Sequence, residues 1–244
     1  MKKLKTEKIL AVNICASPQK EVAKFICKRL KDGKQTVIFT PNPQILLRAQ
    51  RYASYKKTLN SSTLNLPDGI GIILASKIQG GGIKSRISGI DTAKMLLSIA
   101  ESKGYKVFLL GAKPHVAEKA ERALLKKYPA LKICGTHHGY FSKSGKENEG
   151  VIREIAISDP DIIFVCFGSP QQEEWIKTNK DKLPSVSLYI GLGGSLDVFA
   201  GNVKRAPEIM QKAGLEWLYR TVKEPKRAKI FLDIPIFLFS ALTK

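Results

Sequence analysis

The chain has 244 residues, an apolar content of 43% and a formal net charge of +20. This length fits one generous domain, or one domain with an appendage. The charge favours a polyanion or an anionic membrane as a partner. The four cysteines contain no CxxC pair, which argues against a disulfide framework or a zinc site.

Short β-branched apolar runs alternate with segments of helical periodicity along most of the chain. The predicted strands lie at 9–15, 36–40, 106–111, 131–136, 161–168 and 185–191, and the predicted helices at 19–32, 43–54, 90–103, 114–127, 147–158 and 171–180. Near-continuous apolar strands separated by helices predict an α/β fold, a Rossmann-like and mostly parallel sheet flanked by helices. Ligands of such sheets bind beyond the carboxyl ends of the strands, which selects Thr40, Gly111, Gly168 and Gly193 as neighbours of a site.

The sequence changes character near 201–204 and becomes basic, aromatic and apolar. We therefore expect a catalytic core at 1–203 and a helical appendage at 204–244. The longest apolar run, at 230–242, contains Asp233 and Pro235 and is shorter than the roughly 20 residues that span a bilayer. With basic residues before it, this run is typical of a helix in the lipid interface, although packing on the core or in an oligomer would use the same side chains.

The N-terminal segment is basic but is followed by too short an apolar stretch for a signal peptide. We therefore expect a cytoplasmic protein that at most lies on a membrane. A nucleic-acid-binding protein is the alternative that the charge allows. The sequence contains no aromatic-rich RNA-binding signature, zinc-finger spacing or helix-turn-helix pattern.

A glycine-rich turn, GLGG at 191–194, follows an apolar run. A turn without side chains lets backbone N–H groups approach a phosphate, and a helix start adds partial positive charge. A tight turn before a solvated helix is the alternative. An NAD-linked oxidoreductase is disfavoured because Leu196 stands where the dinucleotide fingerprint requires its third glycine.

Seven short segments resemble the WecG/TagA/CpsF family of bacterial glycosyltransferases, in the family's order and spacing. They are FTPNPQ at 39–44, LPDGIG at 66–71, SRISGID at 85–91, LLGA at 109–112, HGYF at 138–141, FGSPQQEEW at 167–175, and RAP, GLEWLYR and EPKR within 205–227. The resemblance implies an enzyme that transfers a sugar from a UDP-sugar to polyprenyl-diphosphate-linked GlcNAc on the cytoplasmic face of the membrane. It also implies peripheral attachment to an anionic membrane surface and a capacity to self-associate.

Within the family, the resemblance favours N-acetylmannosamine as the sugar and undecaprenyl-diphosphate-GlcNAc as the acceptor, as in wall teichoic acid linkage-unit synthesis. UDP-ManNAcA or UDP-glucose, for capsule or common-antigen precursors, are the alternative donors. Many glycosyltransferases hold a metal with an Asp-x-Asp motif. The one such motif here, at 159–161, is better explained as the turn before a strand. We therefore expect no metal and no cofactor.

The family motifs assign the chemistry to particular side chains. Asp68 would be the general base that an inverting transfer needs, although Pro-Asp-Gly is also a standard turn sequence. Arg86 would neutralise charge on the UDP leaving group, with a surface ion pair as its alternative role. Thr40 and Asn42 match active-site positions, although Asn42 also suits the cap of a helix at 43–54. Gln172 would contact sugar hydroxyls.

Two further sets of residues are expected to bind phosphate groups. The residues expected to bind UDP are Gly111, Tyr140, Gly193, Gly194 and Asp197, and those expected to bind the acceptor diphosphate are Arg220 and Arg227. The family often carries another basic residue three positions after Arg227. Here that residue is Ile230, with Lys229 beside it, so this sequence departs from the family at the third contact but not in the rest of the segment.

Overall fold

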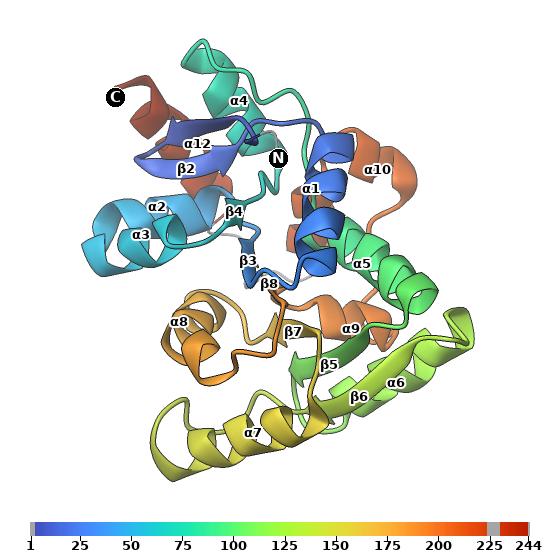
Figure 1. The fold of residues 1–244 in the computed structure, drawn as a ribbon. Helices are drawn as coiled ribbons and strands as arrows, with labels where there is room; N and C mark the ends of the chain where they lie inside the picture. The colour runs from blue at the N-terminus through green and yellow to red at the C-terminus, as the bar shows by residue number, and fades with distance from the viewer. Residues whose placement is uncertain (1–2, 224–229, 244) are drawn as a thin grey trace. The chain divides into compact units, whose positions relative to one another are not determined.

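The computed structural model describes residues 3–223 and 230–243 and divides into two compact units. Unit 1 comprises Met1–Ala23, Thr40–Ser88 and Lys204–Lys244, and unit 2 comprises Lys24–Phe39 and Gly89–Val203. The chain therefore passes between the units four times. Figure 1 colours the chain by residue number, so that each of these segments can be found by its colour.

Unit 2 contains a parallel β-sheet, which confirms the predicted fold class. Its strands run in the order β3 (Thr36–Phe39), β8 (Leu188–Gly191), β7 (Ile162–Cys166), β5 (Lys106–Gly111) and β6 (Lys132–His137). All four pairings among them are parallel. Every residue of β7 and β8 is buried, because helices cover both faces of the sheet.

The helices of unit 2 follow the connections of this sheet. They are α5 (Gly89–Lys103), α6 (Val116–Lys127), α7 (Gly145–Ser158), α8 (Gln171–Asn179), the short 3₁₀ turn η1 (Lys180–Lys182) and α9 (Ser195–Phe199). Helices α6 and α9 pack together on one face, and α7 and α8 lie on the other (Figure 1). Helix α1 (Gln19–Lys31) crosses the boundary between the two units.

Unit 1 begins with a hairpin where the sequence predicted one strand at 9–15, and that prediction is wrong. Strands β1 (Thr6–Ile9) and β2 (Val12–Cys15) pair antiparallel across a turn of two residues. Leu10 and Ala11 form this turn with φ values of 48° and 64°. Such a turn normally uses Asn or Gly. Here Leu10 is buried, at 2% exposure. The turn therefore consists of apolar residues, and the sequence pattern does not distinguish it from a strand.

The remaining elements of unit 1 are helical apart from the two-residue strand β4. They are α2 (Pro43–Arg51), α3 (Ala53–Asn60), β4 (Leu64–Asn65), α4 (Ile70–Ile78), α10 (Glu208–Lys212), α11 (Glu216–Lys223) and α12 (Ile230–Leu242). The helix predicted at 43–54 is interrupted because Tyr52 takes an extended conformation between α2 and α3.

Helix α12 packs on α2 and α4. Phe237 is fully buried and lies 3.8 Å from the position a Cβ on Gly71 would take, while Gln44 donates a hydrogen bond to Asp233 at 2.6 Å. Residues 204–244 belong to unit 1 together with 1–23 and 40–88, and the division into a core at 1–203 and an appendage at 204–244 stays a prediction. Of the helices in the described part of the chain, none has the length and apolar character needed to cross a bilayer.

Candidate active site

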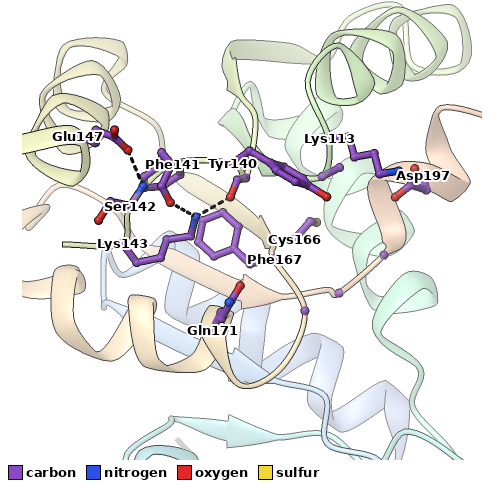
Figure 2. A pocket seen from close by; sticks show the side chains of 15 residues that line it. Lys113, Tyr140, Phe141, Ser142, Lys143, Glu147, Cys166, Phe167, Gln171 and Asp197 are labelled. Carbon is purple, nitrogen blue, oxygen red and sulfur yellow. Dashed lines mark hydrogen bonds between the residues drawn. The ribbon is translucent and has the colours of Figure 1, made fainter. Parts of the chain in front are cut away.

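A cavity of about 870 Å³ opens in unit 2 beyond the carboxyl ends of the parallel strands, where such folds bind ligands. Four loops line it, and each follows one of the strands β5, β6, β7 and β8. Its volume is in the range of small-molecule sites. Figure 2 shows Lys113 and Tyr140 extending toward Asp197 at one end, with Lys143 at the other end.

Backbone hydrogen bonds tie these loops together. The N–H of Gly139 donates to the carbonyl of Ala112 at 2.7 Å, and that of Ala112 donates to Cys166 at 3.0 Å. Ala112 itself has a φ of 60°, a conformation that costs a residue with a side chain about 1 kcal/mol or more. The loops therefore hold their shape through backbone contacts, even though one residue is strained.

Lys143 anchors the loop after β6. Its Nζ donates to the carbonyls of Gly139 at 2.6 Å and Phe141 at 2.9 Å. The same group lies 3.6 Å from the ring centre of Phe141 and 4.3 Å from that of Phe167, in the geometry of a cation–π contact. Burial lowers the pKa of Lys143 to about 8, while the nearby Glu147 carboxylate opposes this shift.

Gln172 lies beneath the glycine turn and is 3% exposed. Its Oε1 accepts a hydrogen bond from the N–H of Gly193 at 2.8 Å, and its Nε2 donates to Glu173 at 2.8 Å. Glu173 is itself buried and also accepts from Ser169 at 2.7 Å, so it is more than a surface charge in the first turn of α8. The N–H of Gly193 that was expected to approach a phosphate is thus bonded to a side chain.

Four of the five residues predicted to bind UDP line the cavity: Tyr140, Gly193, Gly194 and Asp197. Tyr140 is 64% exposed, so its ring is open to a ligand. Gly111 is not among the lining residues. Its φ of 138° and a Cβ position only 2.4 Å from the Cys166 carbonyl oxygen show that it lets β5 and β7 approach closely.

The other predicted catalytic residues lie together in unit 1, on loops joined by backbone hydrogen bonds. The N–H of Asp68 donates to the Pro41 carbonyl at 3.1 Å, and the N–H of Ile87 donates to the Pro67 carbonyl at 2.9 Å. The LPDG loop therefore lies between the loop that holds Thr40 and Asn42 and the loop that holds Arg86.

Close packing of two helix starts fixes the position of Asp68. Gly69, which follows it, has a φ of 109°, a conformation that strongly favours glycine. A Cβ on Gly71 would lie 2.6 Å from Cγ of Pro43 at the start of α2. Asn42 caps α2 by accepting a hydrogen bond from Ile45 at 3.0 Å, which confirms the capping role. Contact of Asn42 or Thr40 with substrate stays a prediction.

Arg86 is held by a carboxylate from the C-terminal segment of unit 1. Its Nη1 lies 3.2 Å from Oε2 of Glu216, and Nη2 of Arg205 lies 3.5 Å from the same oxygen. The three side chains are 18%, 9% and 11% exposed for Arg86, Glu216 and Arg205 respectively. Arg86 therefore does form an ion pair, but this pair is largely buried and does not lie on the surface.

The predicted acceptor-binding arginines lie at the edge of the described chain. Arg220 falls within α11, and Arg227 lies outside the described residues, so both roles stay predictions. In residues 3–223 and 230–243, no three His, Cys, Asp or Glu side chains are grouped as metal ligands.

Sequence reasoning missed several residues of the site. In unit 2 they are Lys113, Phe141, Lys143 and Phe167, and in unit 1 they are Arg205 and Glu216. Lys113 and Phe167 come within two residues of a strand end, so the carboxyl-end rule could have found these two had it been applied to side chains as well as to glycines. Arg205 and Glu216 stand in the RAP and GLEWLYR segments, but their part in the site was missed because Arg86, which Glu216 contacts, is 130 residues away in sequence.

The parallel sheet and the cavity at its carboxyl edge define an α/β protein with a Rossmann-like sheet, in which ligands bind beyond the strand ends. The loops of unit 1 that hold the predicted catalytic residues add a carboxylate and two half-buried arginines. The chain belongs to the Glycosyl transferase WecG/TagA/CpsF family, whose model matches residues 7–244. The resemblance predicted from the seven motifs is confirmed.

Related proteins carry a more specific name, N-acetylglucosaminyldiphosphoundecaprenol N-acetyl-beta-D-mannosaminyltransferase. The relative from Bacillus subtilis (strain 168) is 40% identical over 206 residues, which are 84% of this chain and 78% of the relative. The relative from Staphylococcus aureus (strain MW2) is 40% identical over 202 residues, 83% and 78% respectively. The relative from Bacillus spizizenii is 38% identical over 213 residues, 87% and 81% respectively.

Proposed function

We propose that this chain transfers N-acetylmannosamine from UDP-N-acetylmannosamine to undecaprenyl-diphosphate-linked GlcNAc, in wall teichoic acid linkage-unit synthesis. The observation that carries the proposal is the 40% identity with a relative named for this transfer, across 84% of the chain. The same name favours N-acetylmannosamine over UDP-ManNAcA or UDP-glucose as the source of the sugar. Family membership also makes the alternative of a nucleic-acid-binding protein unnecessary.

The reaction is a displacement at the anomeric carbon of the donor sugar. A hydroxyl oxygen of the acceptor GlcNAc forms the new bond to that carbon, and the bond from the carbon to the β-phosphate oxygen of UDP breaks. The bonding pair leaves with UDP, and the hydroxyl proton passes to the Asp68 carboxylate. One displacement inverts the anomeric configuration.

We propose a separate role for the residues of each unit. In unit 2, the cavity with Tyr140 and Asp197 would hold the nucleotide, and Gln172 would support it through the glycine turn. In unit 1, Asp68 would act as base and Arg86 would neutralise charge on the diphosphate. We propose that these groups act without a metal ion or cofactor.

We further propose that the protein is cytoplasmic and attaches peripherally to the inner face of the plasma membrane through unit 1. The outer side of α12 exposes large apolar side chains, among them Phe231, Leu232, Ile236 and Phe239 at 46–69% exposure. Such a surface suits a helix lying in the lipid interface, close to where a lipid-linked acceptor is found. The same surface could also bring two copies together, and sedimentation with and without vesicles separates the two outcomes.

The test is UDP release from UDP-N-acetylmannosamine in the presence of an undecaprenyl-diphosphate-GlcNAc analogue and EDTA. Wild type should release UDP, and Asp68→Asn should lose about 100-fold or more of kcat, as expected for a missing general base. Asp181→Asn is the matched control, since Asp181 is 77% exposed. Absence of release by folded wild type, with or without added divalent metal, would refute the proposal, and a panel of other UDP-sugars would identify the donor.

A further inference from the structure

Glu216 connects the C-terminal segment of unit 1 to the catalytic loops. The carboxylate is at the first residue of α11, and a single oxygen of it contacts the guanidinium groups of Arg86 and Arg205. These partners are 130 and 11 residues away in sequence. Because both guanidinium groups meet the same oxygen, they lie side by side.

A second contact joins the same segment to the LPDG loop. Gly214 has a φ of 74°, and a Cβ there would lie 2.9 Å from Cβ of Ile70. Ile70 is the first residue of α4 and comes two positions after Asp68. The turn before α11 thus packs directly on the helix that begins behind the proposed base, independently of the ion pairs.

The geometry at Glu216 controls where the guanidinium of Arg86 points. A guanidinium is planar and presents five donors in a fixed arrangement, so a carboxylate that holds one end nitrogen fixes the direction of the whole plane. The low exposure of Arg86, 18%, limits competition from water for this contact. Guanidinium groups bind diphosphates through paired hydrogen bonds, which tolerate little misorientation.

We propose that Glu216 is a positioning residue that orients Arg86, with Arg205 beside it, to bind a diphosphate group during transfer. This inference rests on the proposed function. It makes 205–216 part of the catalytic site, in addition to any role in membrane attachment. The diphosphate is that of the UDP leaving group or that of the lipid-linked acceptor, which share the same chemistry.

The experiment measures UDP release by the full chain with donor and acceptor concentrations varied separately. Glu216→Gln keeps the size of the side chain and removes its charge, and we expect kcat/KM to fall about 10- to 100-fold. A rise in the KM of the donor would assign the site to UDP, and a rise in the KM of the acceptor analogue would assign it to the lipid diphosphate. Glu216→Asp keeps the charge and should lose less than the Gln variant.

Glu208→Gln is the matched control, because Glu208 is an exposed carboxylate on α10 of the same segment. A double-mutant cycle then distinguishes positioning from a merely structural role. If Glu216 acts through Arg86, Arg86→Ala with Glu216→Gln will be no less active than Arg86→Ala alone. Two losses that multiply would overturn the proposal, as would a Glu216→Gln enzyme with wild-type kcat/KM.

Binding of inorganic pyrophosphate, measured by calorimetry, gives a readout that does not need catalysis. We expect Glu216→Gln to weaken it about 10-fold or more, and Glu208→Gln to leave it unchanged. If Glu216→Gln binds pyrophosphate more weakly than wild type but wild type transfers no sugar, the proposed function is refuted while the positioning role of Glu216 stands. If wild type transfers sugar and both variants bind pyrophosphate equally, the positioning role fails alone.

Discussion

Replacing Gln172 with Met tests how the glycine turn of the cavity is held. Met keeps the length and unbranched shape of the side chain, but its thioether is only a weak acceptor for Gly193 and cannot donate to Glu173, the two contacts of 2.8 Å. A neutral hydrogen bond contributes about 0.5–1.5 kcal/mol and one to a carboxylate about 1.5–3 kcal/mol. We therefore expect the free energy of unfolding of unit 2 to fall by about 3 kcal/mol, or Tm by roughly 6–12 °C.

Fluorescence of Trp175 reports on this region, because Trp175 is 2% exposed and bonded to Asn148 at 2.7 Å. A Trp217→Phe background removes the signal of the other tryptophan. Gln171→Met is the matched control, since Gln171 is the exposed neighbour of Gln172 and its replacement should change the unfolding free energy by less than about 0.5 kcal/mol. UDP affinity of the Gln172 variant should fall about 10-fold, because an unsatisfied N–H distorts the turn. Equal unfolding curves for the two variants would refute the assigned contacts.

Three other perturbations have expected outcomes. Gly111→Ala should lower the free energy of unfolding by at least about 3 kcal/mol, because the new Cβ would lie 2.4 Å from a backbone atom and the φ of this position strains a residue with a side chain. Thermal unfolding checks this. Gly150→Ala is the control, because a Cβ at Gly150 meets nothing within 4 Å. Because the pKa of Lys143 is lowered from 10.5 to about 8, the unfolded chain binds more protons between these values, and stability should rise with pH across that window. As the pH rises, Lys143 loses its proton and with it the cation–π contacts to Phe141 and Phe167, so calorimetry should show UDP binding weakening through about pH 8. A Lys143→Met variant that shows the same weakening would contradict this. Leu232→Ser combined with Phe239→Ser, at sites 69% and 68% exposed, should reduce vesicle flotation about 10-fold or more, and unchanged flotation would remove α12 from the membrane contact.

The sequence predicted the parallel sheet well for a physical reason. Buried strands such as β5 and β7 are continuous apolar runs, and such runs between helical segments leave few other arrangements. The hairpin at 6–15 was missed because Leu10 and Ala11 hold left-handed conformations without an Asn or Gly to indicate them. The break at Tyr52 was missed because the apolar period continues across it.

The sequence predicted those parts of the candidate site that depend on a glycine turn or on a family motif. The turn at Gly193 and Gly194 and the open ring of Tyr140 line the cavity as expected, because glycines and family motifs mark such positions. Lys143 was not predictable, since its role depends on two aromatic rings brought together by different strand ends. Glu216 was missed for the same reason, because its partner Arg86 is 130 residues away.

The four passages of the chain between the two units affect how the enzyme can be made. Cleavage of the chain at one position cannot separate either unit from the other, because unit 1 is made of three separate segments and unit 2 of two. On the ribosome, every residue of unit 2 is synthesised before 204–244, whereas the half that carries Asp68 still awaits the segment that contains Glu216. A nascent chain can therefore contain all of unit 2 while unit 1 is unfinished, so we expect transfer activity only after 204–244 has been synthesised.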